Sequence, residues 1–88
     1  MPRYIIERSV PPLSRADLDA VARRSIEVMS GMPDMKWIRS FVSDAEGKIY
    51  CEYDAPSADA ILEHARRAGL PVDRISEVAL EISPSMFV

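Results

Sequence analysis

The segment over residues 48–73 constrains the fold of this chain more than any other. It reads KIYCEYDAPSADAILEHARRAGLPVD, in which a run of β-forming residues is followed by a Pro-Ser pair, an apolar helical stripe and a Gly-Leu-Pro stop. Ser57 suits the N-cap of a helix, Gly69 suits the left-handed residue after one, and Pro71 prevents its continuation. We therefore expect a strand over 48–54 and a short helix after it.

The rest of the chain supplies three more strands and a second helix. Ser14 suits an N-cap, and apolar residues at helical spacing after it predict a helix over 15–29 that ends before Gly31. Turn residues at 44–47 predict a hairpin between the second and third strands. The remaining β-rich segments predict strands over 3–8, 35–43 and 74–82.

The resulting order, strand-helix-strand-strand-helix-strand, is the split βαβ pattern of a ferredoxin-like α+β fold. Right-handed crossovers place the first and third strands at the centre of a four-stranded antiparallel sheet, with both helices on one face. The chain length of 88 residues suits one ferredoxin-like domain over 1–88. A domain of this size buries roughly 60–65% of its unfolded surface, so pairing of two copies would add useful burial.

Composition argues against several classes of protein. The net charge is −3, the sequence pI is near 5.0 and no basic block is present, which argues against a nucleic-acid binder. No apolar run approaches the roughly 18 residues of a membrane span, and the first residues do not resemble a signal peptide. A single cysteine excludes an internal disulfide and suits a reducing compartment, so we expect a cytoplasmic protein.

Strand alternation divides the predicted sheet into two faces. The more apolar set is expected beneath the helices: Tyr4, Ile6, Ile38, Ser40, Val42, Ile49, Cys51, Tyr53, Val78, Leu80 and Ile82. The opposite set mixes large apolar side chains with carboxylates and an arginine: Ile5, Glu7, Trp37, Arg39, Phe41, Tyr50, Glu52, Ile75, Glu77, Ala79 and Glu81. Large exposed apolar patches mark contact sites, so we expect this open face to meet a second subunit, as in a dimeric α+β barrel.

The same open face is the predicted ligand pocket, because two sheets facing one another would enclose a mixed polar and aromatic space. Trp37, Arg39 and Tyr50 are its candidate cofactor-binding residues. Arg39 is expected to pair with Glu7 or Glu52, and a structural ion pair at a dimer interface is the favoured interpretation. The alternative is a ligand or metal pocket between the sheets.

His64 and Cys51 are the only histidine and the only cysteine. His64 is either a metal ligand or proton carrier, or a residue that packs on the sheet and bonds locally; the absence of a spaced partner favours local packing. Cys51 is expected to face the helices as a small core residue rather than act as a nucleophile. No phosphate loop, paired-cysteine zinc motif or Gly-x-Ser-x-Gly elbow is present, so no catalytic residue is predicted.

Three segments together carry a family resemblance: PRYIIER, WIRSFVSD and YCEYDAPSADAILEHARRAGLPVDRISEV. From Pro2 to about Ile82 the chain resembles a family of short bacterial proteins, described largely as a domain of unknown function, that includes nickel-binding members. The resemblance implies a dimeric ferredoxin-like fold and a nickel-binding role. Within the matched motif, His64, Cys51 and Glu52 have suitable donor atoms, and a further carboxylate, water or second subunit would complete the metal's shell.

Three functions stay open at this point. The first, which the resemblance favours, is a small cytoplasmic homodimer that binds nickel with the participation of His64. The second is a small-molecule-binding protein or enzyme that resembles the dimeric α+β barrel monooxygenases, with its pocket on the open sheet face. The third is a structural or regulatory dimer without a ligand of its own.

Overall fold

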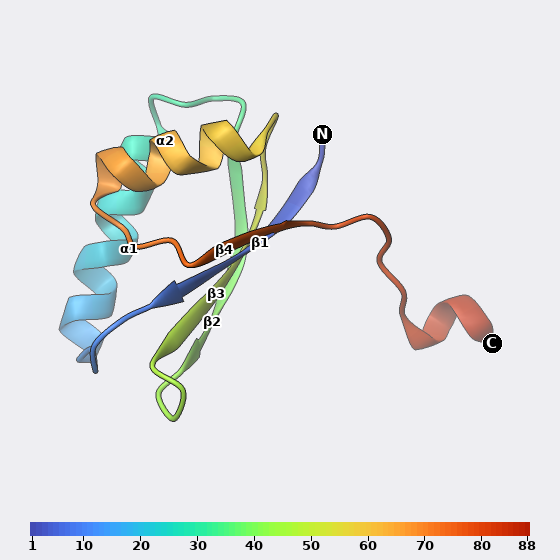
Figure 1. Ribbon diagram of the computed structural model, residues 1–88, viewed down its shortest axis with the longest axis horizontal. Coiled ribbons are helices and arrows are strands. Elements are labelled where there is room, and N and C mark those ends of the chain that lie inside the picture. Colours follow the sequence, from blue (N-terminus) through green and yellow to red (C-terminus); the bar gives the residue numbers. More distant parts are fainter.

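The computed structural model describes residues 1–88. The elements, labelled in Figure 1 where there is room, are β1 (Arg3–Ser9), α1 (Arg15–Met29), β2 (Lys36–Ser43), β3 (Lys48–Asp54), α2 (Ala58–Ala68), β4 (Arg74–Glu77) and the 3₁₀ turn η1 (Pro84–Phe87). The strands form one antiparallel sheet in the order β2-β3-β1-β4. The ferredoxin-like βαββαβ fold predicted from the sequence is confirmed, with β1 and β3 at its centre.

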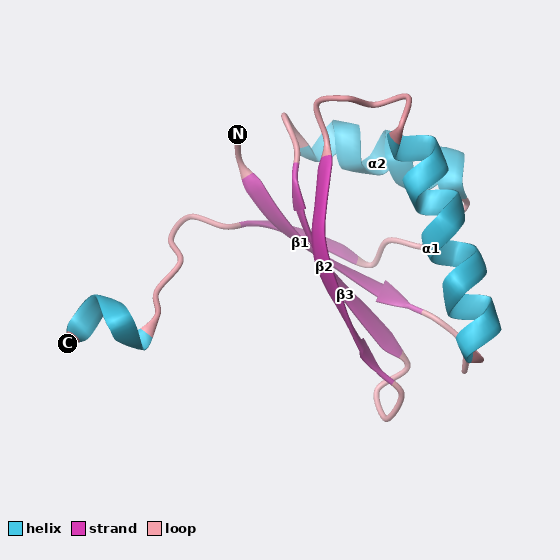
Figure 2. Cartoon of the chain, turned by 180° about the vertical axis from the view of Figure 1, so that it is seen from behind, coloured by secondary structure: helices cyan, strands magenta, loops and turns pink.

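Both helices begin with a capping residue. The Ser14 hydroxyl accepts a hydrogen bond from the Asp17 amide, and the Asp17 carboxylate accepts one from the Ser14 amide, which completes a capping box. The Ser57 hydroxyl accepts from the Ala60 amide at the start of α2. Gly69 ends α2 at a φ of 68°, a left-handed conformation that glycine adopts without a Cβ clash. Figure 2 shows both helices on the same side of the sheet.

The core lies between the central strands and α2. The alternation predicted for β1 and β3 is correct, because Tyr4, Ile6, Ile49, Cys51 and Tyr53 are all buried on the helix side. From α2, the side chains of Ile61, His64, Ala65 and Ala68 are buried against them. Helix α1 is different, since Ser25 is its only buried residue. It packs closely on α2 but stands away from the sheet, and this spacing creates the cavity described below.

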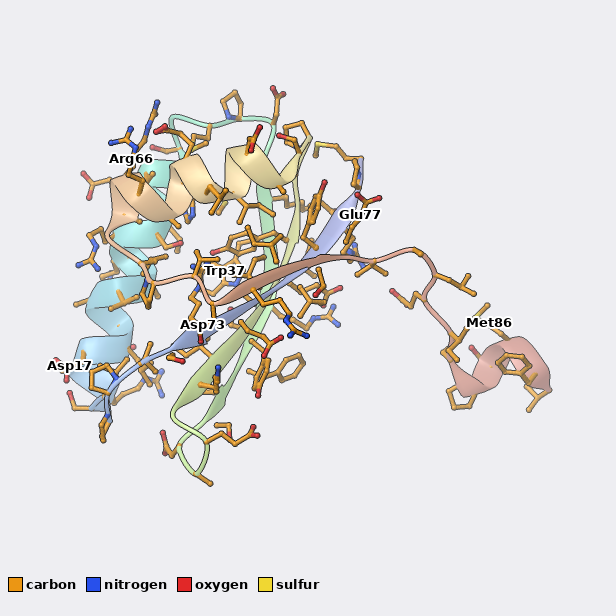
Figure 3. All side chains as sticks on the ribbon, in the orientation of Figure 1. Asp17, Trp37, Arg66, Asp73, Glu77 and Met86 are labelled. Carbon is orange, nitrogen blue, oxygen red and sulfur yellow. The ribbon has the colours of Figure 1, made fainter.

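Strand β2 departs from regular alternation near its beginning. Trp37 pairs with Tyr53, and the register then shifts so that Arg39 pairs with Glu52 and Ser40 with Cys51. This β-bulge adds one residue between Trp37 and Arg39. Residues directly opposite on neighbouring strands share a face, so Trp37 lies on the helix side (Figure 3). The prediction that Trp37 lies on the open face is therefore wrong, because strict alternation fails across a bulge.

Strand β4 is shorter than the predicted 74–82. Its last bond to β1 runs from the Val78 amide to the Arg3 carbonyl, at 2.8 Å. Strand β1 begins at Arg3, so β4 has no further strand residue to pair with beyond this point. Within β4, Ile75 pairs with Ile6 and packs against the core. The assignment of Ile75 to the open face is thus wrong, because the predicted parity depended on residues that lie beyond the strand.

After Val78 the chain leaves the sheet as a C-terminal arm over residues 79–88, and Figure 1 shows it extending away from the body of the molecule. Leu80 and Ile82, predicted to lie beneath the helices, are instead 74% and 64% exposed. Met86 lies near the far end of the arm in Figure 3. The arm carries exposed apolar side chains with no partner within this chain: Leu80, Ile82, Met86, Phe87 and Val88.

Candidate functional site

A cavity of about 410 Å³ lies between α1, the sheet and the loop that follows α2. This volume falls in the range of small-molecule pockets, roughly 300–1,000 Å³. Its walls are mainly apolar, with side chains from α1, from the sheet and from the loop: Leu18, Ala22, Trp37, Val42, Ile49 and Leu70. The cavity is on the helix side of the sheet, whereas the pocket predicted on the open face needs a second subunit and stays a prediction.

Local structure explains why this space stays open. The Val10-Pro11-Pro12 connection leads from β1 into α1 without regular structure, and Val10 and Pro11 form part of the cavity wall. The side chains that α1 turns toward the sheet include the small residues Ala22 and Ser25, which cannot reach across the gap. On the sheet side, the Trp37 indole N–H donates to the Ser40 hydroxyl at 2.9 Å, which holds the ring against the strand.

Arg8 is the charged residue built into the cavity wall. It is only 2% exposed, although arginine is almost never buried without a partner. Its Nη1 donates to the Pro71 carbonyl at 2.9 Å, its Nη2 lies 3.4 Å from the Tyr53 hydroxyl, and its Nε lies 3.5 Å from Cys51 Sγ. None of the ion pairs in the structure includes Arg8. The site therefore holds a buried cation with neutral neighbours.

Sequence reasoning missed Arg8, although a signal was present. Tyr4 and Ile6 were expected beneath the helices, and the same alternation carried one step further places Arg8 on that face. Tyr53 beside it stays a neutral phenol, because burial raises the pKa of its hydroxyl. The Arg8 guanidinium also lies 5.8 Å from the centre of the Tyr53 ring, which is within cation–π distance.

His64 is fully buried, at 0% exposed. Its Nε2 lies 3.2 Å from the Ser25 carbonyl oxygen, so Nε2 carries the proton and donates it there. The Nδ1 atom is then an acceptor without a partner. The ring meets Tyr53 edge-on, with centroids 5.7 Å apart. Burial lowers the pKa of His64 and keeps the imidazole neutral. This arrangement agrees with the local-packing interpretation of His64.

The three predicted metal donors do not come together in one chain. Cys51 and Glu52 are consecutive residues of β3 and point to opposite faces, while His64 lies in the interior between α2 and α1. The Glu52 carboxylate is bound by Arg3 at 3.0 Å and Arg39 at 3.7 Å on the open face. No group of three or more His, Cys, Asp or Glu side chains is placed to hold a metal ion. The residues of a single chain therefore do not fit a nickel site.

The predicted ligand-binding trio is also divided by the sheet. Trp37 lines the cavity on the helix side, whereas Arg39 and Tyr50 lie on the open face with Glu52 and Phe41. The Tyr50 hydroxyl donates to the Glu46 carboxylate at 3.0 Å, and this bond raises the pKa of Tyr50. A ligand in the cavity could touch Trp37 but neither of the other two residues.

Comparison with known proteins identifies the family. A family model described as nickel responsive protein SCO4226-like matches residues 4–78, which include the whole cavity wall. The crystal structure of SCO4226 from Streptomyces coelicolor A3(2) matches this fold with a TM-score of 0.81 at 25% identity, covering 91% of this chain and 99% of that one. No curated protein sequence matches the chain. None of its helices has the length and apolar character needed to cross a membrane. The chain belongs to the SCO4226-like family of nickel-responsive proteins.

Proposed function

We propose that this member of the nickel-responsive family is a small-molecule-binding protein, with the cavity between α1 and the sheet as its ligand site. The observation that carries this proposal is a cavity of about 410 Å³ with mainly apolar walls beside a helix that buries only Ser25. Because this pocket is partly open, its apolar walls meet solvent instead of making the contacts that close packing would supply. A ligand with an apolar body would restore those contacts by filling the space.

The test is calorimetric titration with 1-naphthoate, a compact apolar probe, against a pair of matched variants on α1. Ala22 lines the cavity, whereas Ala20 is exposed on the same helix and does not. We expect Ala22→Phe to fill the space and weaken binding about tenfold or more, and Ala20→Phe to leave it unchanged. Equal affinities for the two variants would refute the cavity as the binding site.

We also propose that the protein is a homodimer that pairs through the open face of the sheet. Phe41 is 62% exposed there and pairs with the half-buried Tyr50, while the half-buried Ile5 lies on the same face of β1. The arm over 79–88 begins on the same side, where Glu81 lies 3.4 Å from Arg3. Both the open face and the arm expose apolar side chains, and a second copy of this chain would cover them.

Direct nickel binding is the second candidate function, and the description of the family supports it. Because one chain supplies no group of donors, a nickel site in this fold would need ligands from two subunits. Elemental analysis of the purified protein, with its mass in solution, tests this: the proposal expects nickel in the dimer and none in a monomeric variant. We propose a cytoplasmic location, where the unpaired Cys51 would remain reduced.

A further inference from the structure

Arg8 is the only Arg, Lys, Asp or Glu side chain of this chain that is buried. A buried charge costs several kcal/mol unless an opposite charge and good hydrogen bonds compensate for it. Each nitrogen of the guanidinium has a single neutral partner, from Pro71, Tyr53 or Cys51. A guanidinium has five N–H donors, so further donors of the group are left without an acceptor in this chain and could bind an oxygen-bearing anion.

The charges around the cavity favour the same conclusion. Arg24 is a second cation on its wall, and Arg24 Nε donates to the Ala68 carbonyl. Asp19 is the only carboxylate among the lining residues, and Arg15 neutralises it across a distance of 3.0 Å. The lining residues therefore carry a net positive charge, which disfavours a cation and favours an anion.

We infer that the cavity binds a small carboxylate with an apolar body, whose charged group meets Arg8. This inference rests on the proposed ligand-binding function and specifies its ligand class. A guanidinium matches a carboxylate because two parallel N–H groups can donate to its two oxygens. By comparison with the ~150 Å³ cavity that holds the six carbons of benzene, this one takes up to about 16 non-hydrogen atoms. The apolar body packs against Trp37, Leu18 and Val42 on opposite walls.

The decisive experiment compares probes that share a shape and differ in charge. Calorimetry on the full chain measures the affinities of 1-naphthoate and 1-naphthamide, and of octanoate and octanamide. We expect at least one carboxylate to bind about 10- to 100-fold more tightly than its amide, the range for a buried charged hydrogen bond. This comparison uses the unaltered protein, so it does not depend on the stability of any variant.

Variants then assign the preference to Arg8. We expect Arg8→Gln to bind carboxylate and amide equally and Arg8→Lys to keep part of the preference. Arg23→Gln removes an exposed charge from α1 outside the cavity and serves as the matched control, with the preference unchanged. Equal binding of carboxylate and amide by the unaltered protein would overturn the inference and leave ligand binding intact. Binding of none of the four probes would overturn the ligand-binding function as well.

Discussion

The guanidinium of Arg8 lies 3.5 Å from the sulfur of Cys51, through Nε, on the wall of the cavity. The only cysteine of the chain thus has a cation as its neighbour, on the opposite side of the sheet from Glu52. A metal ion at Cys51 would be repelled by this positive charge. The same pair of residues therefore weakens the predicted nickel site and supports a cavity for anions.

The first prediction concerns nickel. We expect the unaltered protein, Cys51→Ser and His64→Gln to take up the same amount of nickel with the same affinity, because Cys51 adjoins a guanidinium and His64 is completely buried. Calorimetric titration with nickel chloride measures both quantities. Loss of binding in either variant, with its circular dichroism spectrum unchanged, would restore that residue as a ligand.

The second prediction concerns the cost of keeping Arg8 buried. Exchange of buried charged groups for apolar side chains of similar volume is often neutral or stabilising when no opposite charge is left behind, and Arg8 has no anionic partner. We expect Arg8→Met to unfold at the same urea concentration as the unaltered protein or a higher one, and to lose carboxylate binding. Because the variant loses the hydrogen bonds to Pro71 and Tyr53, its gain in unfolding free energy is limited to about 1 kcal/mol. Destabilisation by more than about 2 kcal/mol would show that Arg8 serves mainly as structural support.

The third prediction concerns pH. The folded-state pKa of His64 is lowered from its ordinary value of 6.5 by burial, so the unfolded chain binds the proton more readily. Stability is therefore complete above this ordinary value and falls as the pH drops below it. Urea unfolding between about pH 7.5 and 5 should show this loss, with a slope of at most about 1.4 kcal/mol per pH unit for one proton.

The control for this pH dependence is His64→Gln, which can donate to the Ser25 carbonyl but does not titrate. We expect its unfolding free energy to be nearly constant over the same pH range. The carboxyl groups of Asp54 and Asp73, whose pKa values are lowered by hydrogen bonds from Arg3 and Lys48, act at a more acidic pH. An equal slope in the variant and the unaltered protein would exclude His64 as its source.

The fourth prediction concerns the loop that closes the cavity. Gly69 has a φ of 68°, and Leu70 and Pro71 after it form part of the cavity wall. We expect Gly69→Ala to cost about 1–2 kcal/mol, because an L-residue is strained in this conformation. Gly31→Ala is the matched control, since Gly31 has no positive φ and its new Cβ would meet only ordinary contact. Thermal unfolding compares the two variants. An equal loss of stability in both would contradict the assignment of backbone strain to position 69.

The fifth prediction concerns the dimer. Phe41→Glu and removal of residues 79–88 each take away part of the proposed interface. We expect the unaltered protein to have the mass of two chains in light scattering, and each variant to shift toward one chain. Leu62→Glu changes an exposed apolar residue on α2 instead and should leave the mass unchanged. A monomeric unaltered protein at high concentration would refute the proposal.

Local chemistry in the sequence was enough to predict the fold. Ser14 and Ser57 cap the helices as expected, Gly69 ends α2, and the order of elements led to the correct sheet. The alternation of β1 and β3 also held, because both strands are central and paired along their whole length. The resemblance led to the correct family.

The edge strands were predicted less well, because their limits depend on partners elsewhere in the chain. The bulge after Trp37 moved that residue to the helix side, and β4 ended where its neighbour β1 begins at Arg3. Neither feature has a clear signal within its own segment.

The sequence alone determined which segments become helices and strands, since caps, turns and alternation act over a few residues. Only the tertiary structure decided that α1 stands away from the sheet and that Arg8 faces the resulting cavity without an anionic partner. The physical reason is that burial and charge compensation depend on neighbours distant in the chain. Pro71, which accepts from Arg8, is 63 residues away along the sequence.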